Sequence, residues 1–190
     1  TTKVLTTWNP SIAAIMGVGG GRKEKHLGLG DIVVADKCFH YQFGSFEDGE
    51  FARELVNENV HRQVLDIAGN LRRTTALSQI QNLPSRGVKK PKTVLQCHIG
   101  PMGSADLVVK DVEKFGAAIG ADRKTIAVDM ESYAFMHSTA LARTPVSFVV
   151  KSVSDFADAE KDDEYREYAK FTATEFFKRI AEALIQNSQE

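Results

Sequence analysis

The sequence has little of what marks several common classes of protein. Its 190 residues include two cysteines, Cys38 and Cys97, which are too few for a disulfide scaffold and too far apart for a local metal or redox motif. We therefore expect both to be reduced and buried, in a cytoplasmic protein. No apolar run approaches the roughly 18 residues that span a bilayer, and no signal-peptide pattern opens the chain. We accordingly expect no membrane partner.

An excess of charge of either sign is also missing. The chain has 24 Lys and Arg residues and 25 Asp and Glu residues, so the formal net charge is -1. This balance gives no general attraction to nucleic acid, and we expect no nucleic-acid partner. A local imbalance does occur between Ile67 and Ala105, where there is no acid and where the basic residues are Arg72, Arg73, Arg86, Lys89, Lys90 and Lys92. We interpret this stretch as a solvated charge run, the alternative being a site for substrate phosphates.

What the sequence does contain is an alternation of strand and helix patterns, with 43% hydrophobic residues to form a core. Unbroken apolar runs predict strands over Ile12–Val18, Asp31–Cys38, Thr93–Ile99, Ile126–Val128 and Val146–Val150. Helical spacing of apolar residues predicts helices over Phe51–Leu71 and Tyr133–Leu141, a helix or bend from Asp106, and a last helix after Asp162. The class is therefore α/β, a three-layer αβα sandwich with a central, mainly parallel mixed sheet.

Two segments between these elements are expected to be irregular. Phe39–Gly49 is rich in aromatic residues and glycine without helical period, which is typical of a loop over a site or at a subunit contact. A plain surface loop is the alternative. Gly100–Ser104 follows a predicted strand and contains glycine and proline, so it is expected to be a turn.

Acidic residues follow two strands, predicted to be neighbours in the sheet, at their carboxyl ends. Asp129 and Glu131 come directly after Ile126–Val128, and Asp155 follows the strand that begins at Val146. Ligands of open α/β sheets bind at the carboxyl ends of strands, so these acids predict a site. Alternatively, the first two are helix first-turn acids and the third is a loop cap.

A glycine triplet, Gly19–Gly21, follows the first predicted strand. Glycines let a ligand approach the backbone closely and free N–H groups to face it. The triplet matches neither the Walker loop nor the complete dinucleotide-binding fingerprint. By itself such a triplet is more often a plain turn.

These motifs, in order along nearly the whole chain, resemble the nucleoside phosphorylase and methylthioadenosine/S-adenosylhomocysteine nucleosidase superfamily. The matching segments are Gly17–Gly21, Leu29–Ala35, His98–Asp106, Val128–Ser132, Ser154–Asp158 and Lys161–Asp163. The carboxyl-terminal part resembles the variant that is fused to signalling or defence proteins. The resemblance implies cleavage of the bond between ribose C1′ and a purine nitrogen, with adenine as the expected base.

The resemblance also implies roles for individual residues. Glu131 is expected to bind the ribose hydroxyls, with Met130 packing on the sugar. Asp155 is expected to protonate or hydrogen-bond N7 of the purine, with Ser154 orienting it. Two carboxylates in different environments can divide such work, as they do in glycoside hydrolysis.

Further substrate contacts follow from the same match. Backbone at Val108 and Val109 is expected to line the base pocket, and Gly19 and Gly20 to lie beside the ribose. Lys151, which stands where the hydrolases carry an arginine, is assigned to substrate binding.

Two positions that lack the family's polar residues favour water over phosphate as the nucleophile. Val18 stands where members that hold phosphate or position water have a serine, and Ile15 stands where the phosphorylases have an arginine. Without that hydroxyl and that guanidinium, charge-assisted bonds to phosphate are lost. We therefore expect a hydrolytic N-glycosidase, with two alternatives: a phosphate-dependent phosphorylase, and a catalytically silent nucleoside-binding or oligomerising module.

We expect residues 1–190 to form a single domain of this type that lacks the family's first strands, including the glutamate that activates water in the hydrolases. Because Thr1 is not an initiator methionine, the numbering is expected to describe part of a longer or processed polypeptide. By resemblance we also expect a homo-oligomer, a dimer or higher, in which the aromatic loop completes a neighbouring pocket. No cofactor and no metal is expected.

Overall fold

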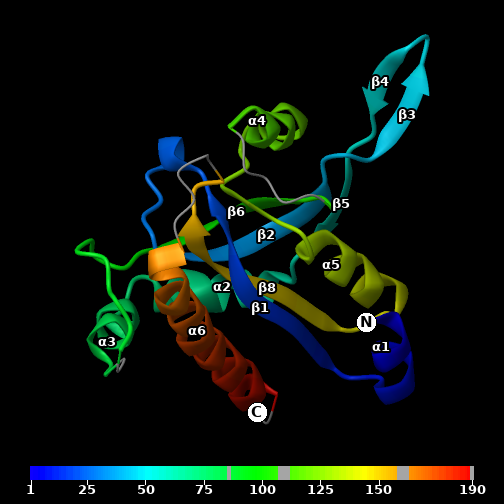
Figure 1. Ribbon diagram of the computed structural model, residues 1–190. Coiled ribbons are helices and arrows are strands. Elements are labelled where there is room, and N and C mark those ends of the chain that lie inside the picture. Colours follow the sequence, from blue (N-terminus) through cyan, green and yellow to red (C-terminus); the bar gives the residue numbers. More distant parts are fainter. Residues whose placement is uncertain (85–86, 107–111, 158–162, 189–190) are drawn as a thin grey trace.

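A mixed β-sheet forms the centre of the molecule (Figure 1). The computed structural model describes residues 1–84, 87–106, 112–157 and 163–188. The strands of the main sheet are β1 (Ile12–Gly21), β2 (Ile32–His40), β5 (Val56–Asn59), β6 (Cys97–Ser104), β7 (Ala127–Asp129) and β8 (Val146–Asp155). Their order is β5-β2-β6-β7-β1-β8. The remaining strands, β3 (Gly44–Glu47) and β4 (Glu50–Arg53), form a hairpin that projects from the body of the molecule (Figure 1).

The main sheet also closes on itself, because β8 pairs with β2 as well as with β1. The two long ladders, β1–β8 and β2–β6, are parallel, as is β6–β7. The pairs β1–β7, β2–β8 and β2–β5 are antiparallel. The predicted mixed sheet with long parallel ladders is therefore confirmed, and its closure was not anticipated.

Helices flank this sheet. Their bounds are α1 (Thr2–Trp8), α2 (Arg62–Leu71), α3 (Ala76–Asn82), α4 (Val112–Ala121), α5 (Ser132–Leu141) and α6 (Arg166–Asn187). The long helix α6 packs on β8 and β1 and also meets α2 and α3, whereas α5 packs on β2, β5 and β6 and meets α1. The α/β class predicted from the sequence is thus confirmed.

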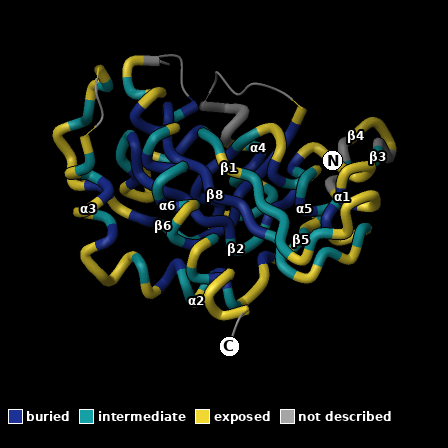
Figure 2. The backbone as a smooth tube through the Cα atoms, turned by 90° about the horizontal axis from the view of Figure 1, so that it is seen from below, coloured by how far each residue is buried: buried dark blue, intermediate teal, exposed yellow. Residues whose placement is uncertain are grey.

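The main core joins the sheet to α6 and also includes buried residues of α2, α3 and α5. Figure 2 shows the central strands buried and the turns around them exposed. The largest side chains of this core include those of Ile32, Phe148, Phe176 and Ile180, none of which is exposed. A second, smaller cluster lies near the carboxyl ends of β2, β6 and β7, and consists of Phe39, Tyr41, Ala105, Ala118, Val128 and Ala157.

The helix predicted over Phe51–Leu71 is wrong in its first half. That half contains β4 and β5, and α2 begins only at Arg62. In β5, Val56 and Glu58 are partly buried while their neighbours are exposed, and the strand pairs with β2. The spacing of the apolar residues alone is compatible with a helix. Residues 56–59 form a strand instead because β2 provides backbone hydrogen-bond partners for them.

The predicted strand Thr93–Ile99 and the predicted turn after it are also corrected. Strand β6 begins at Cys97 and continues through Pro101 to Ser104. Proline has no N–H for a ladder, and the β2–β6 register is irregular at this point, between the pairs Ala35↔Gly100 and Cys38↔Met102. The irregularity accommodates the proline within a continuing strand.

The predicted strand–helix–strand order of Thr125–Asp158 is confirmed by β7, α5 and β8. Strand β8 extends past Val150 to Asp155, and β1 extends through the glycine triplet to Gly21. The prediction that the two strands with acidic ends are neighbours is wrong, because β1 lies between β7 and β8. The predicted base-pocket residues Val108 and Val109, and part of the segment before the last helix, lie outside the described residues.

Both cysteines are free and buried, as predicted, and burial raises the pKa of the Cys97 thiol to about 12. Within the described ranges, no helix combines the length and the apolar character needed to cross a membrane.

Candidate active site

The glycines at the end of β1 stand between the two strands that carry acidic ends. Gly20 is paired with Val128 of β7 on one side and with Asp155 of β8 on the other. Since neighbouring strands lie about 4.8 Å apart, the ends of β7 and β8 are separated by roughly 10 Å. That separation suits a nucleoside placed across the end of β1.

The chain needs glycine at these positions because the strands approach closely. A Cβ atom on Gly19 would lie 2.8 Å from the carbonyl oxygen of Val128. A Cβ atom on Gly20 would lie 2.9 Å from the Cβ of Ala157. The structure therefore places both glycines beside the acidic strand ends, within strand β1 and not in a turn.

Asp129, at the end of β7, is the most strongly held acid of the group. Its side chain is 2% exposed. Oδ1 accepts hydrogen bonds from Ser104 Oγ (2.7 Å) and the Ser132 backbone N–H (3.2 Å), and Oδ2 accepts one from Ser132 Oγ. These contacts tie the end of β6 to the start of α5.

Lys151, on β8, joins Asp129 to Glu131. Its Nζ lies 2.9 Å from Asp129 Oδ2 and 3.0 Å from Glu131 Oε2, and its side chain is 4% exposed. Burial favours the neutral amine, but the two carboxylates outweigh it and raise the pKa of Lys151 above its ordinary value of 10.5. The ammonium therefore stays charged, and it lies against Gly17, whose absent side chain leaves room for it.

Glu131 and Met130 lie at the accessible edge of this network. The Glu131 side chain is 57% exposed and Met130 is 41% exposed, just before α5 begins at Ser132. Lys151 fixes one carboxylate oxygen of Glu131 from beneath. A partly exposed, oriented carboxylate can accept hydrogen bonds from vicinal hydroxyl groups.

Asp155 ends β8 in a different environment. It is 8% exposed, and it accepts hydrogen bonds from Ser154 Oγ to Oδ2 (2.9 Å) and from the Ala157 backbone N–H to Oδ1 (2.9 Å). Ser154 Oγ also lies 3.4 Å from the carbonyl oxygen of Gly19. The structure thus brings Ser154, Asp155 and Gly19 together.

Sequence analysis gave no individual role to Asp129, although it counted this acid among those that predict a site, and it gave none to Ser104 or Ser132. Asp129 was noticed as a strand-end acid, and its position three residues before Ser132 is the kind of local spacing that lets a side chain bond a helix start. The contact with Ser104, 25 residues away, leaves no such local signal.

Two lysines of the basic stretch make contacts within the domain. Lys89 pairs with Glu164 and lies 5.7 Å from the Tyr165 ring centroid, while Lys90 donates to the carbonyl oxygens of Gln81 and Leu83. Both ammonium groups are thus engaged within the domain, which argues against a role in binding substrate phosphates.

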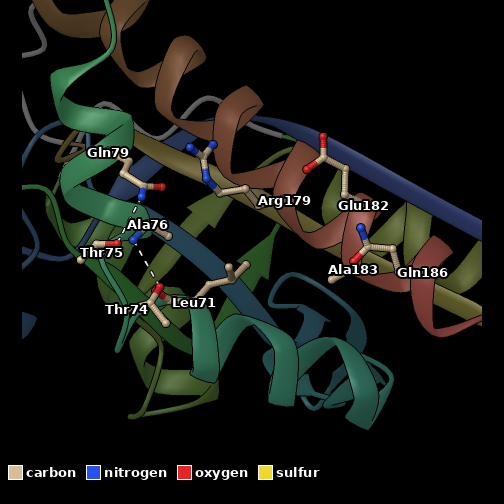
Figure 3. Close-up of a pocket in the computed structure, with 9 residues that line it drawn as sticks. All are labelled: Leu71, Thr74, Thr75, Ala76, Gln79, Arg179, Glu182, Ala183 and Gln186. Carbon is tan, nitrogen blue, oxygen red and sulfur yellow. Dashed lines mark hydrogen bonds between the residues drawn. The ribbon is translucent and has the colours of Figure 1, made fainter.

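Other described residues line two cavities. One, of about 400 Å³, is lined by Arg72, Arg73, Leu77, Gln96, Cys97 and His98. It lies at the start of β6, seven residues and roughly 20 Å from Ser104 at the other end. The other, of about 290 Å³, lies between the α2–α3 turn and α6, with Arg179 and Gln79 facing it (Figure 3). None of the predicted site residues within the described ranges lines either cavity.

Over the described ranges, no three His, Cys, Asp or Glu side chains are arranged to hold a metal ion. Glu131 and Asp155 offer the chemistry of two carboxyl groups in unlike settings. One is a half-exposed carboxylate braced by a buried lysine, and the other is a nearly buried carboxyl oriented by two donors.

Comparison with known proteins identifies the family of this chain. The family model of the phosphorylase superfamily matches residues 1–186. An uncharacterized protein, y4jS, from Sinorhizobium fredii is 30% identical over 89% of this chain and 42% of its own length. ATP nucleosidase Cap17 from Escherichia coli is 22% identical over 91% of this chain and 36% of its own length. The chain thus spans less than half of these two curated relatives.

A solved structure shows the same fold. The 5′-methylthioadenosine/S-adenosylhomocysteine nucleosidase from Neisseria meningitidis, in complex with methylthio-immucillin-A, superimposes with a TM-score of 0.75 at 18% identity. The match covers 96% of this chain and 74% of that one. With the family model matching nearly its whole length, the chain belongs to the phosphorylase superfamily.

Proposed function

We propose that this protein is a purine nucleoside or nucleotide N-glycosidase, which uses water to release the base, adenine, from ribose. The observation that carries the proposal is the placement of Glu131 and Asp155 at strand ends on either side of Gly19–Gly20. The names of its relatives, an ATP nucleosidase and a methylthioadenosine/S-adenosylhomocysteine nucleosidase, support the same reaction class.

On the ribose side, Glu131 accepts hydrogen bonds from the sugar hydroxyls while Met130 packs on the ring. The ion pair with Lys151 keeps a positive charge beside this carboxylate and fixes its direction. Lys151 serves the substrate through Glu131, since both carboxylates of the network already bind its ammonium group. As C1′ becomes oxocarbenium-like, an oriented carboxylate holds the sugar in the reactive geometry.

On the base side, Asp155 hydrogen-bonds or protonates N7 of the purine. The bond between C1′ and the base nitrogen breaks with its electron pair leaving on the base, so a proton at N7 neutralises the charge that develops there. Ser154 and the Ala157 N–H orient the Asp155 carboxyl for this contact. Backbone at Val108 and Val109 completes the base pocket in this proposal.

Water is favoured over phosphate as the nucleophile. Ile15 and Val18, on β1, carry aliphatic side chains, which offer no hydrogen bond or charge to a phosphate dianion. A phosphorylase would need other groups to hold that anion close to C1′.

We further propose that the protein is a single domain that works as a cytoplasmic homo-oligomer. The β3–β4 hairpin, which projects from the body (Figure 1), and Phe43, 49% exposed at its base, support a subunit contact there. Free, buried cysteines suit a reducing compartment. Light scattering of Phe43→Ser beside the unaltered protein tests the contact, and a monomer in both samples would refute it.

The test of the reaction is chromatographic detection of free base after incubation with adenosine, methylthioadenosine, AMP and ATP, with and without phosphate. Release that does not need phosphate, and that Asp155→Asn abolishes, is the expected result. Release only with phosphate would establish the phosphorylase instead. Binding of adenosine without any release would establish a silent binding module.

A further inference from the structure

Tyr41, just after β2, buries a hydroxyl group that has no partner. The residue is 2% exposed, and among the described residues no donor or acceptor lies within hydrogen-bonding distance of its hydroxyl. Buried polar groups in folded proteins almost always have a partner, because leaving water without a replacement bond is unfavourable. A hydroxyl that stays unpaired in the folded chain is a candidate for pairing with a ligand.

The position of this tyrosine links it to the candidate active site. Its backbone N–H donates to the carbonyl oxygen of Ser104 (3.3 Å), the residue whose Oγ bonds Asp129. Its ring lies over Gly103, where an added Cβ would be 3.0 Å from Tyr41 Cδ1. Burial, and then the charge of Asp129, raise the pKa of the Tyr41 hydroxyl. It is therefore a neutral group that can donate a hydrogen bond.

The surroundings of Tyr41 are apolar and reach both acidic strand ends. Tyr41 belongs to the smaller buried cluster, which also contains Val128 and Ala157. Val128 directly precedes Asp129, and the backbone N–H of Ala157 bonds Asp155. Small-molecule sites are mainly apolar with a few well-placed polar groups. An apolar cluster with one unused hydroxyl suits a flat heteroaromatic ring better than a sugar.

We propose that the Tyr41 hydroxyl is a hydrogen-bonding contact for the purine base bound at this site. The assignment rests on the proposed function, and it adds to the base side a residue that neither the motifs nor the carboxylate geometry indicated. The ribose is left to Glu131 on the accessible side of the network.

The test compares Tyr41→Phe with the unaltered protein by calorimetric titration of adenine and of adenosine, together with thermal unfolding of the ligand-free chain. The matched control is Tyr168→Phe, which removes a hydroxyl from a tyrosine that is equally buried, 1% exposed, in α6. Tyr41→Phe is expected to weaken adenine and adenosine alike, by about tenfold. Its unfolding midpoint should stay the same or rise, because no bond is lost in the free chain. Tyr168→Phe should leave both affinities unchanged.

Several results would overturn the assignment. Unchanged affinities in Tyr41→Phe would do so, as would a lower unfolding midpoint at unchanged affinity, which would assign the hydroxyl a structural role. Weaker adenosine binding with unchanged adenine binding would move the contact to the ribose. If the unaltered protein binds neither compound, the proposed function itself fails and this assignment fails with it, so the two failures are distinguishable.

Discussion

Two buried aspartates, Asp31 and Asp129, are stabilised by different kinds of partner. Their side chains are 3% and 2% exposed. Asp31 accepts bonds from the backbone N–H groups of Gly28 (2.8 Å) and Gln96 (2.9 Å), and its Oδ2 lies 3.0 Å from His98 Nε2. Asp129 has the lysine ammonium of Lys151 instead.

The difference separates a structural carboxylate from one that supports a site. The backbone partners of Asp31 join two loops before β2 and β6, and nothing in that set leads to an exposed carboxylate. The Lys151 ammonium that neutralises Asp129 also pairs with Glu131, which is half-exposed. A buried ion pair that continues to the surface fixes a reactive group there, and its removal should affect both stability and activity.

The largest effect is expected from Lys151→Met. This change removes the cation and leaves Asp129 buried without its charge partner, so we expect the free energy of unfolding to fall by about 3 to 5 kcal/mol. Urea unfolding measures it. Adding Asp129→Asn to this variant should lower the free energy of unfolding only slightly further. If the loss in the double variant equals the sum of the losses in the two single variants, the pairing of Lys151 with Asp129 is contradicted.

The same pair predicts a pH dependence at the alkaline end. The pKa of Lys151 is raised in the folded state above 10.5, so the folded chain holds this proton more tightly than the unfolded chain. Its contribution to stability is complete below pH 10.5 and is lost as the pH rises through the folded-state pKa. Unfolding curves above pH 10.5 should therefore show a loss that Lys151→Met lacks. Parallel curves for the two proteins would contradict this.

A smaller effect is expected from Asp31→Asn. An amide NH₂ would replace one of the oxygens that now accept bonds from Gly28, Gln96 and His98, and it would face donors. We expect a loss of about 2 to 3 kcal/mol in unfolding free energy, with the rate of base release unchanged under conditions where the variant is folded. A selective loss of activity would show that Asp31 also serves the site.

The next effect concerns the backbone between the acidic strand ends. Gly19→Ala would place Cβ 2.8 Å from the Val128 carbonyl oxygen, and the strand shift should cost about 1 to 2 kcal/mol. The control is Gly69→Ala in α2, where an added Cβ meets no atom within 4 Å and where alanine should stabilise by about 0.5 to 1 kcal/mol. Thermal unfolding of both variants tests this difference. Equal shifts of the unfolding midpoint in the two variants would contradict it.

The sequence supported the parts of this account that depend on local pattern. The apolar runs Ile126–Val128 and Val146–Val150 predicted two strands, and the acids that follow them predicted a site. The glycine triplet allowed a close approach of a ligand but was also consistent with a plain turn. The spacing of Leu55, Val56 and Val60 led to the wrong prediction of a helix there, because a short edge strand and a helix can share this spacing over so few residues.

Long-range partners could not be predicted in this way. The placement of β1 between β7 and β8, and the pairing of β8 with β2, depend on segments more than a hundred residues apart. Lys151 was noticed only for the arginine that it replaces, and its ion pairs follow from that topology. The unpaired hydroxyl of Tyr41 is a property of packing, which no local spacing records.

The smallest expected effect on stability provides the most direct test of the central claim. In Glu131→Gln, both the rate of adenine release and the free energy of unfolding should be measured. Glu131 is half-exposed, so stability should change by less than about 1 kcal/mol. Base release should fall by at least about a hundredfold, because the oriented charge beside the ribose is lost. Release at the unaltered rate from this variant would contradict the claim that the Lys151-braced carboxylate is part of the active site.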